Sequence, residues 1–470
     1  MSVSIQTIAE AIGAPDAAKD WADNLIRWAA IYSCKPVERV VTLRDGAHKR
    51  RIRSLSMGKR IAEDWAGLCW TENATVEVDG ADGVLAEMLD EMYGDRFAPG
   101  FVDFLERVFA QGLGGTEVLI HGMKLSPNGA VAFDGASIEL AHADAQCIIP
   151  LAWTPREITS AAFVSFPSKT RVDVRIHSDG PGVKVITNRS FNVRGAKLVE
   201  MRQDELIAEG TAPVVTIQSP FRLFSVLKPA IANNIDATSP YGVPVFANAE
   251  DHLATLDLMF DNMAEDFELG GKIVGVPEFM LRRDANDQVI PPQRDKKNLF
   301  VALEGAAGVA GGATQIWEHN PDLRVEDNKA GIDAMLSLLS SAVGMGSERY
   351  VYRGETIATA TQIISENSDL FRSRRKHMLS VTAHLTDITR AVLWLASNLL
   401  GMTANPDAEV VIRSDDSVIE DDNSRIARGL TLVQNNVISK RTFLVDYMGM
   451  TEEDADTEVG RLTVAVPALF

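Results

Sequence analysis

The sequence predicts an α+β fold in which helices predominate. A 46-residue segment, 355–400, contains neither glycine nor proline, and its apolar residues recur at helical spacing. Two shorter segments, 247–269 and 328–343, carry the same kind of pattern. Within 116–220, short runs of β-branched residues alternate with turn residues, which is typical of strands. A hydrophobic content of 46% and a charged content of 24% indicate a globular chain, and 470 residues suffice for about three domains.

The composition argues against several classes of protein. The net charge is −19, whereas proteins that grip nucleic acid present a basic face, so the plain interpretation of the charge is solubility. Cys34, Cys69 and Cys147 lie too far apart for a zinc knuckle or a disulfide framework, which indicates a reducing compartment. The N-terminal residues do not resemble a signal peptide, and the apolar run 391–396 is too short to span a bilayer. We therefore expect a protein without membrane contact, kept in the cytosol unless a larger particle carries it.

The first 121 residues predict helices followed by a strand. Residues 4–33 are interpreted as one or two helices, and helical spacing returns at 57–68 and 100–112. A strand is expected at 116–121 after a cluster of glycines. The basic run HKRRIR, residues 48–53, is interpreted as a solvated loop, and contact with DNA or with an acidic neighbour is the alternative.

Two helices flank a small irregular module in the middle of the chain. The apolar residues of 247–269 step by three and four, which is heptad spacing and predicts a narrow packing seam. The helix at 328–343 has a similar apolar side. The module between them, 272–323, is rich in glycine, but it lacks the GxxxxGKS or GxxxxGKT pattern of a phosphate-binding loop. The seam residues are Leu253, Leu256, Phe260, Met263 and Phe267 on the first helix and Ile332, Met335 and Leu339 on the second.

The longest helix is expected within 355–400. A row of apolar residues recurs every seven positions from Ile364 to Leu399, with a second row between them, so one continuous stripe is predicted. An unbroken helix of this size would be about 60 Å long. Ordinary globular helices end earlier, so the length indicates a coiled-coil-like or scaffolding role. The polar stretch 365–369 is expected to admit a kink.

Catalytic motifs are absent from the sequence, which contains no GxSxG, HExxH, Walker loop, GxGxxG or CxxC pattern. His142 and Asp144 are too isolated to indicate a catalytic pair. His377 and His384 lie seven residues apart on one helix face, where a metal pair with Glu366 is conceivable, but a structural role is the preferred interpretation.

Two clusters of charged residues, one acidic and one basic, are further candidates for a binding site. The acidic residues of 415–422 lack the glycine and the final glutamate of a calcium loop, so a solvated helix start is preferred. A basic group on the long helix is interpreted as a set of surface ion-pair partners. The sequence therefore predicts a protein that is not an enzyme and holds neither cofactor nor metal. The basic group consists of Arg372, Arg374, Arg375 and Lys376.

Three segments resemble tailed-bacteriophage portal proteins. TATQIISENSDLFRSRRKH, residues 359–377, is similar to a portal motif that commonly reads TATEVISENS followed by a basic helix, although Gln362 stands where many relatives have glutamate. MGKRIAEDWAGLCWTE, residues 57–72, resembles a portal helix that reads roughly MAKKICEEMASLIWSE. Residues 436–462 resemble the C-terminal helical ending of the family. These segments lie near the beginning, the late middle and the end, so the resemblance covers most of the chain.

The resemblance implies a portal fold and a structural function. A portal is a ring, usually of twelve subunits, at one capsid vertex, and DNA enters and leaves the head through its axial channel. The parts of a portal subunit then map onto the chain in order. They are a wing at 1–246 with its β-rich part at 116–220, a first stem helix at 247–271, a clip at 272–323, a second stem helix at 324–343, a tunnel loop at 344–357, a long wing helix at 358–400 and a crown at 401–470.

The resemblance also implies the partners and the location. They are further copies of the chain in a dodecameric ring, double-stranded DNA passing without sequence specificity, the terminase large subunit, a head-completion adaptor, and coat and scaffold proteins. The location is the virion, with the host cytoplasm during assembly. A negative charge multiplied around a pore would repel phosphates and limit sticking of DNA. The tunnel-loop residues are Ser347, Glu348, Arg349, Tyr350 and Arg353.

Within that loop, Arg349 and Arg353 are expected to damp the motion of DNA, and pairing with Glu348 or Glu355 of a neighbouring subunit is the alternative. Two other functions stay open for the chain. One is another multimeric structural protein of a phage head or tail. The other, with less support, is a cytosolic enzyme, which would need a pocket of convergent polar groups.

Overall fold

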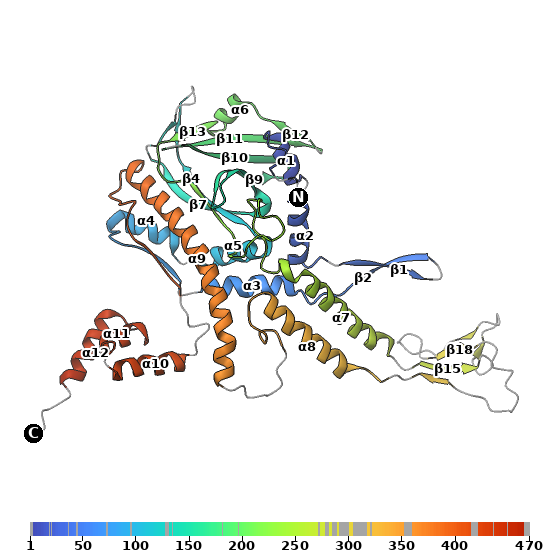
Figure 1. Cartoon of the computed structure of the whole chain (residues 1–470). Coiled ribbons are helices and arrows are strands. Elements are labelled where there is room, and N and C mark those ends of the chain that lie inside the picture. The colour runs from blue at the N-terminus through green and yellow to red at the C-terminus, as the bar shows by residue number, and fades with distance from the viewer. Residues whose placement is uncertain are drawn as a thin grey trace, which may run out of the picture. The chain divides into compact units, whose positions relative to one another are not determined.

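The computed structural model confirms an α+β fold that is mainly helical (Figure 1). The chain divides into two compact units. The first unit contains Met1–Ala22, Glu63–Val243 and Phe371–Phe470, and the second contains Asp23–Ala62 and Pro244–Leu370. The structure describes residues 3–464 apart from 18, 20, 36, 44–45, 72–73, 95, 127–130, 134, 181, 196, 271–272, 278–281, 284–288, 291–299, 304–316, 320–321, 352–359, 415–421, 436 and 449.

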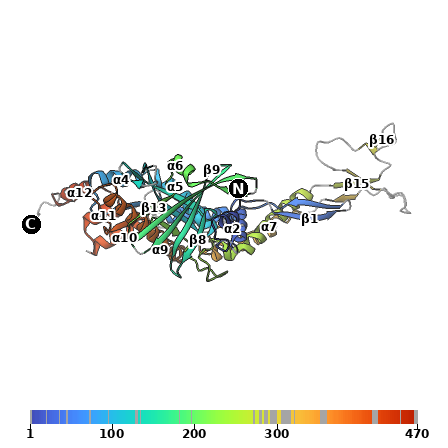
Figure 2. The ribbon, with the colours of Figure 1, turned by 90° about the horizontal axis from the view of Figure 1, so that it is seen from above.

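An antiparallel six-stranded sheet forms the β-rich part of the first unit (Figure 2). Its strands are β8 (Ile148–Trp153), β9 (Ile158–Ser168), β10 (Arg171–Gly180), β11 (Val183–Arg194), β12 (Lys197–Glu200) and β13 (Val214–Ile217). The main path runs β12–β11–β10–β9–β8, and β13 also pairs with β11. The register joins Gly180 to Val183 across the turn between β10 and β11, so these two strands form a long hairpin. Val172 and Val174 of β10 are both fully buried, as the two-residue period of a strand requires.

A three-stranded antiparallel sheet in the same unit has the order β14 (Phe224–Leu227), β4 (Gly114–His121) and β7 (Ser137–Asp144). Glu117 of β4 joins it to the larger sheet, because Arg175 Nη2 of β10 donates to its carboxylate at 2.7 Å and His177 Nε2 donates at 3.0 Å. Glu117 is only 2% exposed. Burial acts to raise the pKa of Glu117, but the hydrogen bonds from His177 and Arg175 outweigh it and lower the pKa. This buried, paired charge fixes the position of the smaller sheet against the larger one.

Helix α9 (Ala360–Asn398) supplies the core of the first unit with its second half. Ile388, Val392 and Leu395 are each at most 1% exposed, and they belong to a core cluster with residues of α4 (Gly83–Tyr93), β4 and β13. The predicted apolar stripe is therefore confirmed over this half. The helix continues without interruption through 365–369.

The two backbones at Gly112 and Gly242 touch inside the first unit. Gly112 follows α5 (Phe97–Gln111) with a φ of +82°, and its amide donates to the carbonyl of Val108 at 2.8 Å. A Cβ added to Gly112 would lie 2.6 Å from the carbonyl oxygen of Gly242, and one added to Gly242 would lie 2.2 Å from that of Gly112. Only glycine fits both the left-handed conformation and the close approach.

The remaining elements of the first unit are short. Strand β20 (Val410–Arg413) pairs antiparallel with β3 (Thr75–Val78), and Gly429 of α10 lies against the ring of Tyr447. The others are α1 (Ile5–Ala11), β5 (Lys124–Leu125), β6 (Val131–Ala132), η1 (Ala145–Cys147), α6 (Gln203–Ala208), α10 (Asp422–Gln434), α11 (Lys440–Asp446) and α12 (Glu452–Val464). Helix α3 (Met57–Cys69) begins in the second unit and ends in the first.

The second unit is built on two helices, α7 (Glu250–Leu269) and α8 (Val325–Ala342), which pack against each other. Both occupy the segments in which the sequence predicts helices. Between them lie short strands, of which β15 pairs in parallel with β18 and antiparallel with β19. The other elements are α2 (Ala22–Tyr32), β1 (Glu38–Leu43), β2 (Gly46–Arg51), η2 (Ala247–Ala249), β15 (Ile273–Pro277), β16 (Arg282–Arg283), β17 (Val289–Ile290), β18 (Phe300–Leu303) and β19 (Trp317–His319).

Replacing Gly112 with alanine is expected to lower the thermal unfolding midpoint strongly. The left-handed φ alone costs about 1 kcal/mol, and the clash with the backbone at Gly242 adds to it. Gly210→Ala is the matched control, because Gly210 has a φ of +80° but no neighbour near the added Cβ. Calorimetry should show a larger shift for Gly112→Ala, and equal shifts would contradict the close contact.

Candidate functional site

Helix α7 carries a stripe of acidic side chains, and cationic side chains of the second unit pair with them. Its twenty residues include seven carboxylates and neither lysine nor arginine. Asp257, Asp261, Glu265 and Glu268 follow one another at intervals of four, four and three, which places them on one face of the helix. At the beginning of the helix, Glu250 accepts hydrogen bonds from Trp28 Nε1 at 2.8 Å and from Arg27. Such a density of like charge requires nearby cations to stabilise the helix.

Asp261 is the buried centre of this acidic stripe. Its side chain is 4% exposed. Arg50 Nη2 donates to it at 2.6 Å, and the backbone amide and Nη1 of Arg53 donate at 3.2 and 3.3 Å. The same two arginines also reach Glu265 and Glu268. Arg50 lies in strand β2, one residue before its end, so these bonds attach the β1–β2 hairpin to α7.

The basic run HKRRIR is therefore not simply a solvated loop. The alternative interpretation, contact with an acidic neighbour, describes Arg50 and Arg53, whose neighbour is α7 of the same chain. Leu55, just beyond the run, donates its amide to Asp257 at 2.9 Å. Burial raises the pKa of Asp257, and the hydrogen bonds from Leu55 and Ser54 oppose that change.

Helix α8 also contacts the acidic helix α7, close to the C-terminal end of α7. Arg324 Nη2, at the N-terminus of α8, donates to Asp266 near the C-terminus of α7 at 2.8 Å, and Asn328 Nδ2 donates to it at 3.0 Å. The hydrogen bonds from Asn328 and Arg324 lower the pKa of Asp266. A Cβ on Gly331 would meet Met259 at 3.8 Å, so the helices approach closely here. These contacts make α7 and α8 an antiparallel pair.

The predicted seam residues are placed unevenly in this pair. Leu253, Leu256 and Leu339 are buried, whereas Phe267 is 51% exposed. The half-buried members are Phe260, Met263, Ile332 and Met335. The role of these side chains in packing between copies of the chain stays a prediction.

The segment after α8 is ordered by contacts to that helix. Gly344 has a φ of +79°, and the amide of Met345 donates to the carbonyl of Ser340 at 3.0 Å, which ends the helix. The amide of Tyr350 donates to Ser340 Oγ at 3.3 Å, and its hydroxyl donates to Met345 Sδ at 2.9 Å. Ser347, Glu348 and Arg349 therefore lie on a short loop whose two ends are held at α8. Arg353 and Glu355 lie outside the described residues.

The histidines of α9 are internal structural groups. His384 Nε2 lies 2.9 Å from Thr116 Oγ1, and its Nδ1 lies 3.0 Å from Ser225 Oγ. Thr116 Oγ1 also lies 2.9 Å from His142 Nδ1, so one hydrogen-bonded chain links α9 to all three strands of the smaller sheet. His377 Nδ1 accepts the amide of Ala230 at 3.1 Å. Burial lowers the pKa of His384 to about 3 and those of His142 and His377 to about 4.

The other residues considered as catalytic or ion-pairing groups also make contacts within the fold. Asp144 accepts from Arg107 Nε at 2.7 Å. Arg374 is buried and donates from Nε to the carbonyl of Leu68 at 2.6 Å, near the end of α3, so it is not a surface ion-pair partner. The neighbours Arg372, Arg375 and Lys376 are exposed. The side chain of Glu366 and the acidic cluster at 415–421 lie outside the described residues.

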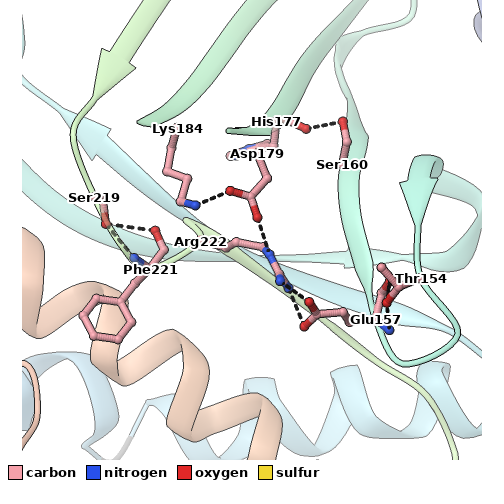
Figure 3. A network of polar contacts seen from close by, with 9 residues as sticks. All are labelled: Thr154, Glu157, Ser160, His177, Asp179, Lys184, Ser219, Phe221 and Arg222. Atoms are coloured by element: carbon pink, nitrogen blue, oxygen red, sulfur yellow. Dashed lines mark hydrogen bonds and ion pairs between the residues drawn. The ribbon is translucent and has the colours of Figure 1, made fainter. Parts of the chain in front are cut away.

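The first unit contains a polar cleft of about 530 Å³ between α9 and the segment around β14. Its wall is a fixed ion-pair network (Figure 3), in which Arg222 donates from Nε to Asp179 at 2.8 Å and from Nη1 to Glu157 at 2.9 Å. Lys228 and Asp387 also line the cleft, and burial lowers the pKa of Lys228 and raises that of Asp387. Ser225 and His384 also line the cleft, with Ser225 Oγ 3.0 Å from His384 Nδ1. The other ring nitrogen of His384 is held by Thr116, and burial lowers the pKa of this histidine to about 3, so the ring is a weak base.

The described residues indicate neither a metal-binding site nor a membrane-spanning helix. Within them, no group of three or more histidine, cysteine, aspartate or glutamate side chains is placed to hold a metal ion. No helix in the described part of the chain has the length and apolarity needed to cross a membrane.

Sequence reasoning missed Asp261, the buried residue on which this site depends. The available signal was the spacing of carboxylates along 257–268 together with the basic run at 48–53, since the two sets carry opposite charge. The apolar seam of the same helix is the clearer pattern and draws attention away from these charges.

Asp261→Asn is expected to loosen the β1–β2 hairpin. Two arginines would then face an uncharged group, at a cost of about 1.5 kcal/mol once solvent screening is allowed for, or roughly tenfold in the open population. Limited trypsin digestion followed by mass spectrometry should show faster cleavage within 44–53. Asp251→Asn, an exposed position on the same helix, is the control and should leave the rate unchanged.

The buried histidines should make the stability of the first unit depend on pH. Their folded pKa values lie below the unfolded value near 6.5, so the stability that they contribute is present above pH 6.5 and is lost as the pH falls toward 4 and 3. His384→Gln should flatten this dependence by up to one proton, about 1.4 kcal/mol per pH unit. Denaturant unfolding from pH 7 to 4 measures the slope, and an unchanged slope would refute the assignment.

Comparison with known proteins gives no family for the chain. No protein-family model matches it, and no curated protein matches it. Among solved structures, one similar chain comes from the "neck of native GTA particle computed with C12 symmetry", with 14% identity, 83% of this chain and 88% of that chain covered, and a TM-score of 0.34. Another comes from the "neck of empty GTA particle computed with C6 symmetry", with 13% identity, coverages of 84% and 88%, and a TM-score of 0.35. TM-scores below 0.5 do not establish a common fold, so we base the function proposed below on the residues of this chain.

Proposed function

We propose that this chain is a structural subunit of a phage head-to-tail junction and, more specifically, a portal protein. The observation that carries the proposal is the resemblance of residues 359–377 to the portal motif, at the beginning of the long helix α9. The antiparallel pair α7–α8 with a small strand module between its ends supports it, because a portal subunit has two stem helices joined by a clip. The alternative function is another multimeric head or tail protein.

In this proposal the ring is held by a heterologous interface that closes on itself. The helix pair acts as a rigid stem, because it combines buried leucines with charged contacts at Asp261 and Asp266. The loop that begins at Gly344 faces the channel, with Arg349 and Arg353 near the DNA. The net charge of −19 on every copy keeps phosphates from adhering elsewhere along the channel.

In this proposal the chain catalyses no reaction. The energy for DNA translocation comes from the terminase large subunit, a separate partner that docks on the clip at 272–323. The head-completion adaptor takes the same end after packaging, and coat and scaffold proteins surround the wing. This division of roles agrees with the polar cleft described above, whose charged groups hold one another in place.

Electron microscopy of the purified protein is expected to show rings with a central hole, about twelve subunits in circumference. Native mass spectrometry gives the number of subunits. A monomer or dimer under all conditions would refute the portal proposal. Capture of the terminase large subunit by the rings distinguishes a portal from another multimeric head or tail protein, for which no such binding is expected.

A further inference from the structure

The β1–β2 hairpin has one covered face and one open face. Register pairs Val40 with Lys49 and Glu38 with Arg51, which places these four residues on the face opposite to Arg50. Arg50 lies against α7, so the other face points away from that helix. Val40 is 63% exposed, and the side chains of Glu38, Lys49 and Arg51 are also exposed.

The hairpin is also open at its edges. In the part of the chain that the structure describes, β1 and β2 pair only with each other, as a separate two-stranded ribbon (Figures 1 and 2). An isolated two-stranded ribbon is marginally stable in water, and its unpaired edges invite association. Attachment of one face to α7 leaves the other face, which carries Val40, without a cover.

The charge of the hairpin identifies the kind of partner. On the open face, the two cations Lys49 and Arg51 outnumber the one acidic residue, Glu38, whereas the whole chain has a net charge of −19. Lys49 pairs with Glu38 at 2.9 Å, and Arg51 makes no ion pair with a described residue. An acidic surface therefore complements the open face, and another copy of this chain provides one.

The start of α8 is the acidic surface that suits this contact. Asp322, Glu326 and Asp327 are exposed there together with Lys329, while the nearby Arg324 pairs with Asp266. The carboxylates of the α7 stripe, by contrast, are already held by Arg50, Arg53 and other cations of the same chain. On α8, Asp327 attracts the neighbouring Arg324, whereas Asp322 and Glu326 make no ion pair with a described residue, so a second hairpin would meet these two carboxylates.

We infer that the open face of the β1–β2 hairpin docks on the start of α8 of a second copy of this chain. The inference rests on the proposed ring and specifies one of its contacts. Each copy offers one hairpin and one α8, so the contact is heterologous and can repeat around a ring. Because its charges are exposed, the contact should weaken as salt is raised.

Charge reversal tests the inference with the full-length protein. K49E/R51E should lose the ring species in sedimentation velocity, or require about tenfold more protein to form it. The hairpin itself stays attached, because Arg50 and Arg53 are unchanged, and thermal unfolding checks that the variant is folded. K169E/K197E makes the same change in net charge at exposed lysines of the first unit and should assemble like the wild type.

A charge swap then identifies the partner surface. Adding E326K/D327K to K49E/R51E should restore rings, since the two reversed faces attract again. Failure of the swap to restore rings would overturn the assignment to α8. Normal rings from K49E/R51E would overturn the inference and leave the portal proposal standing, whereas absence of wild-type rings would refute both. Loss of binding to a duplex DNA probe in K49E/R51E, with rings intact, would assign the hairpin to DNA instead.

Discussion

The second unit depends on one electrostatic constraint, the excess of negative charge on α7. Seven carboxylates in twenty residues repel one another, and burying one of them, Asp261, is costly without a cation. Arg50 of the hairpin and Arg53 just after it pair with Asp261, and Arg324 at the start of α8 pairs with Asp266. The helix therefore determines where its neighbours attach. Substitution of a single carboxylate would release one neighbour and leave the others in place.

The first unit is organised by hydrogen bonds that enter an apolar core. The stripe on α9 buries leucine and valine, but His384 on the same helix reaches Thr116 and Ser225 on two strands. Glu117, next to Thr116 in the sequence, points to the other sheet and holds Arg175 and His177. Adjacent residues of β4 thus bond in opposite directions, as alternation along a strand requires. The result is one strand that fixes both a helix and a second sheet.

Much of the secondary structure could be predicted from the sequence, because periodicity is a local property. The helices α3, α5, α7, α8 and α9 lie where the apolar spacing predicts them, and strand β4 covers the predicted 116–121 but begins earlier, at Gly114. The pairing of Arg50 with Asp261 could not be predicted in the same way, since 211 residues separate the partners and spacing does not reveal which distant charges meet. The buried position of Arg374 in the basic group on α9 could not be predicted either, because spacing alone does not show which of four adjacent cations faces the core. The division into wing, stem, clip and crown and the roles of the loop residues stay predictions.

The position of Arg374 and His377 affects what the portal-like motif means. Both belong to the segment that resembles portal proteins, and both are buried, where they hold the end of α3 and the backbone at Ala230. Their identities are required by the docking of one helix rather than by contact with DNA. Matching residues at these two positions therefore indicate how the helix packs inside the subunit. Two proteins could share the motif and differ in every surface that meets a partner.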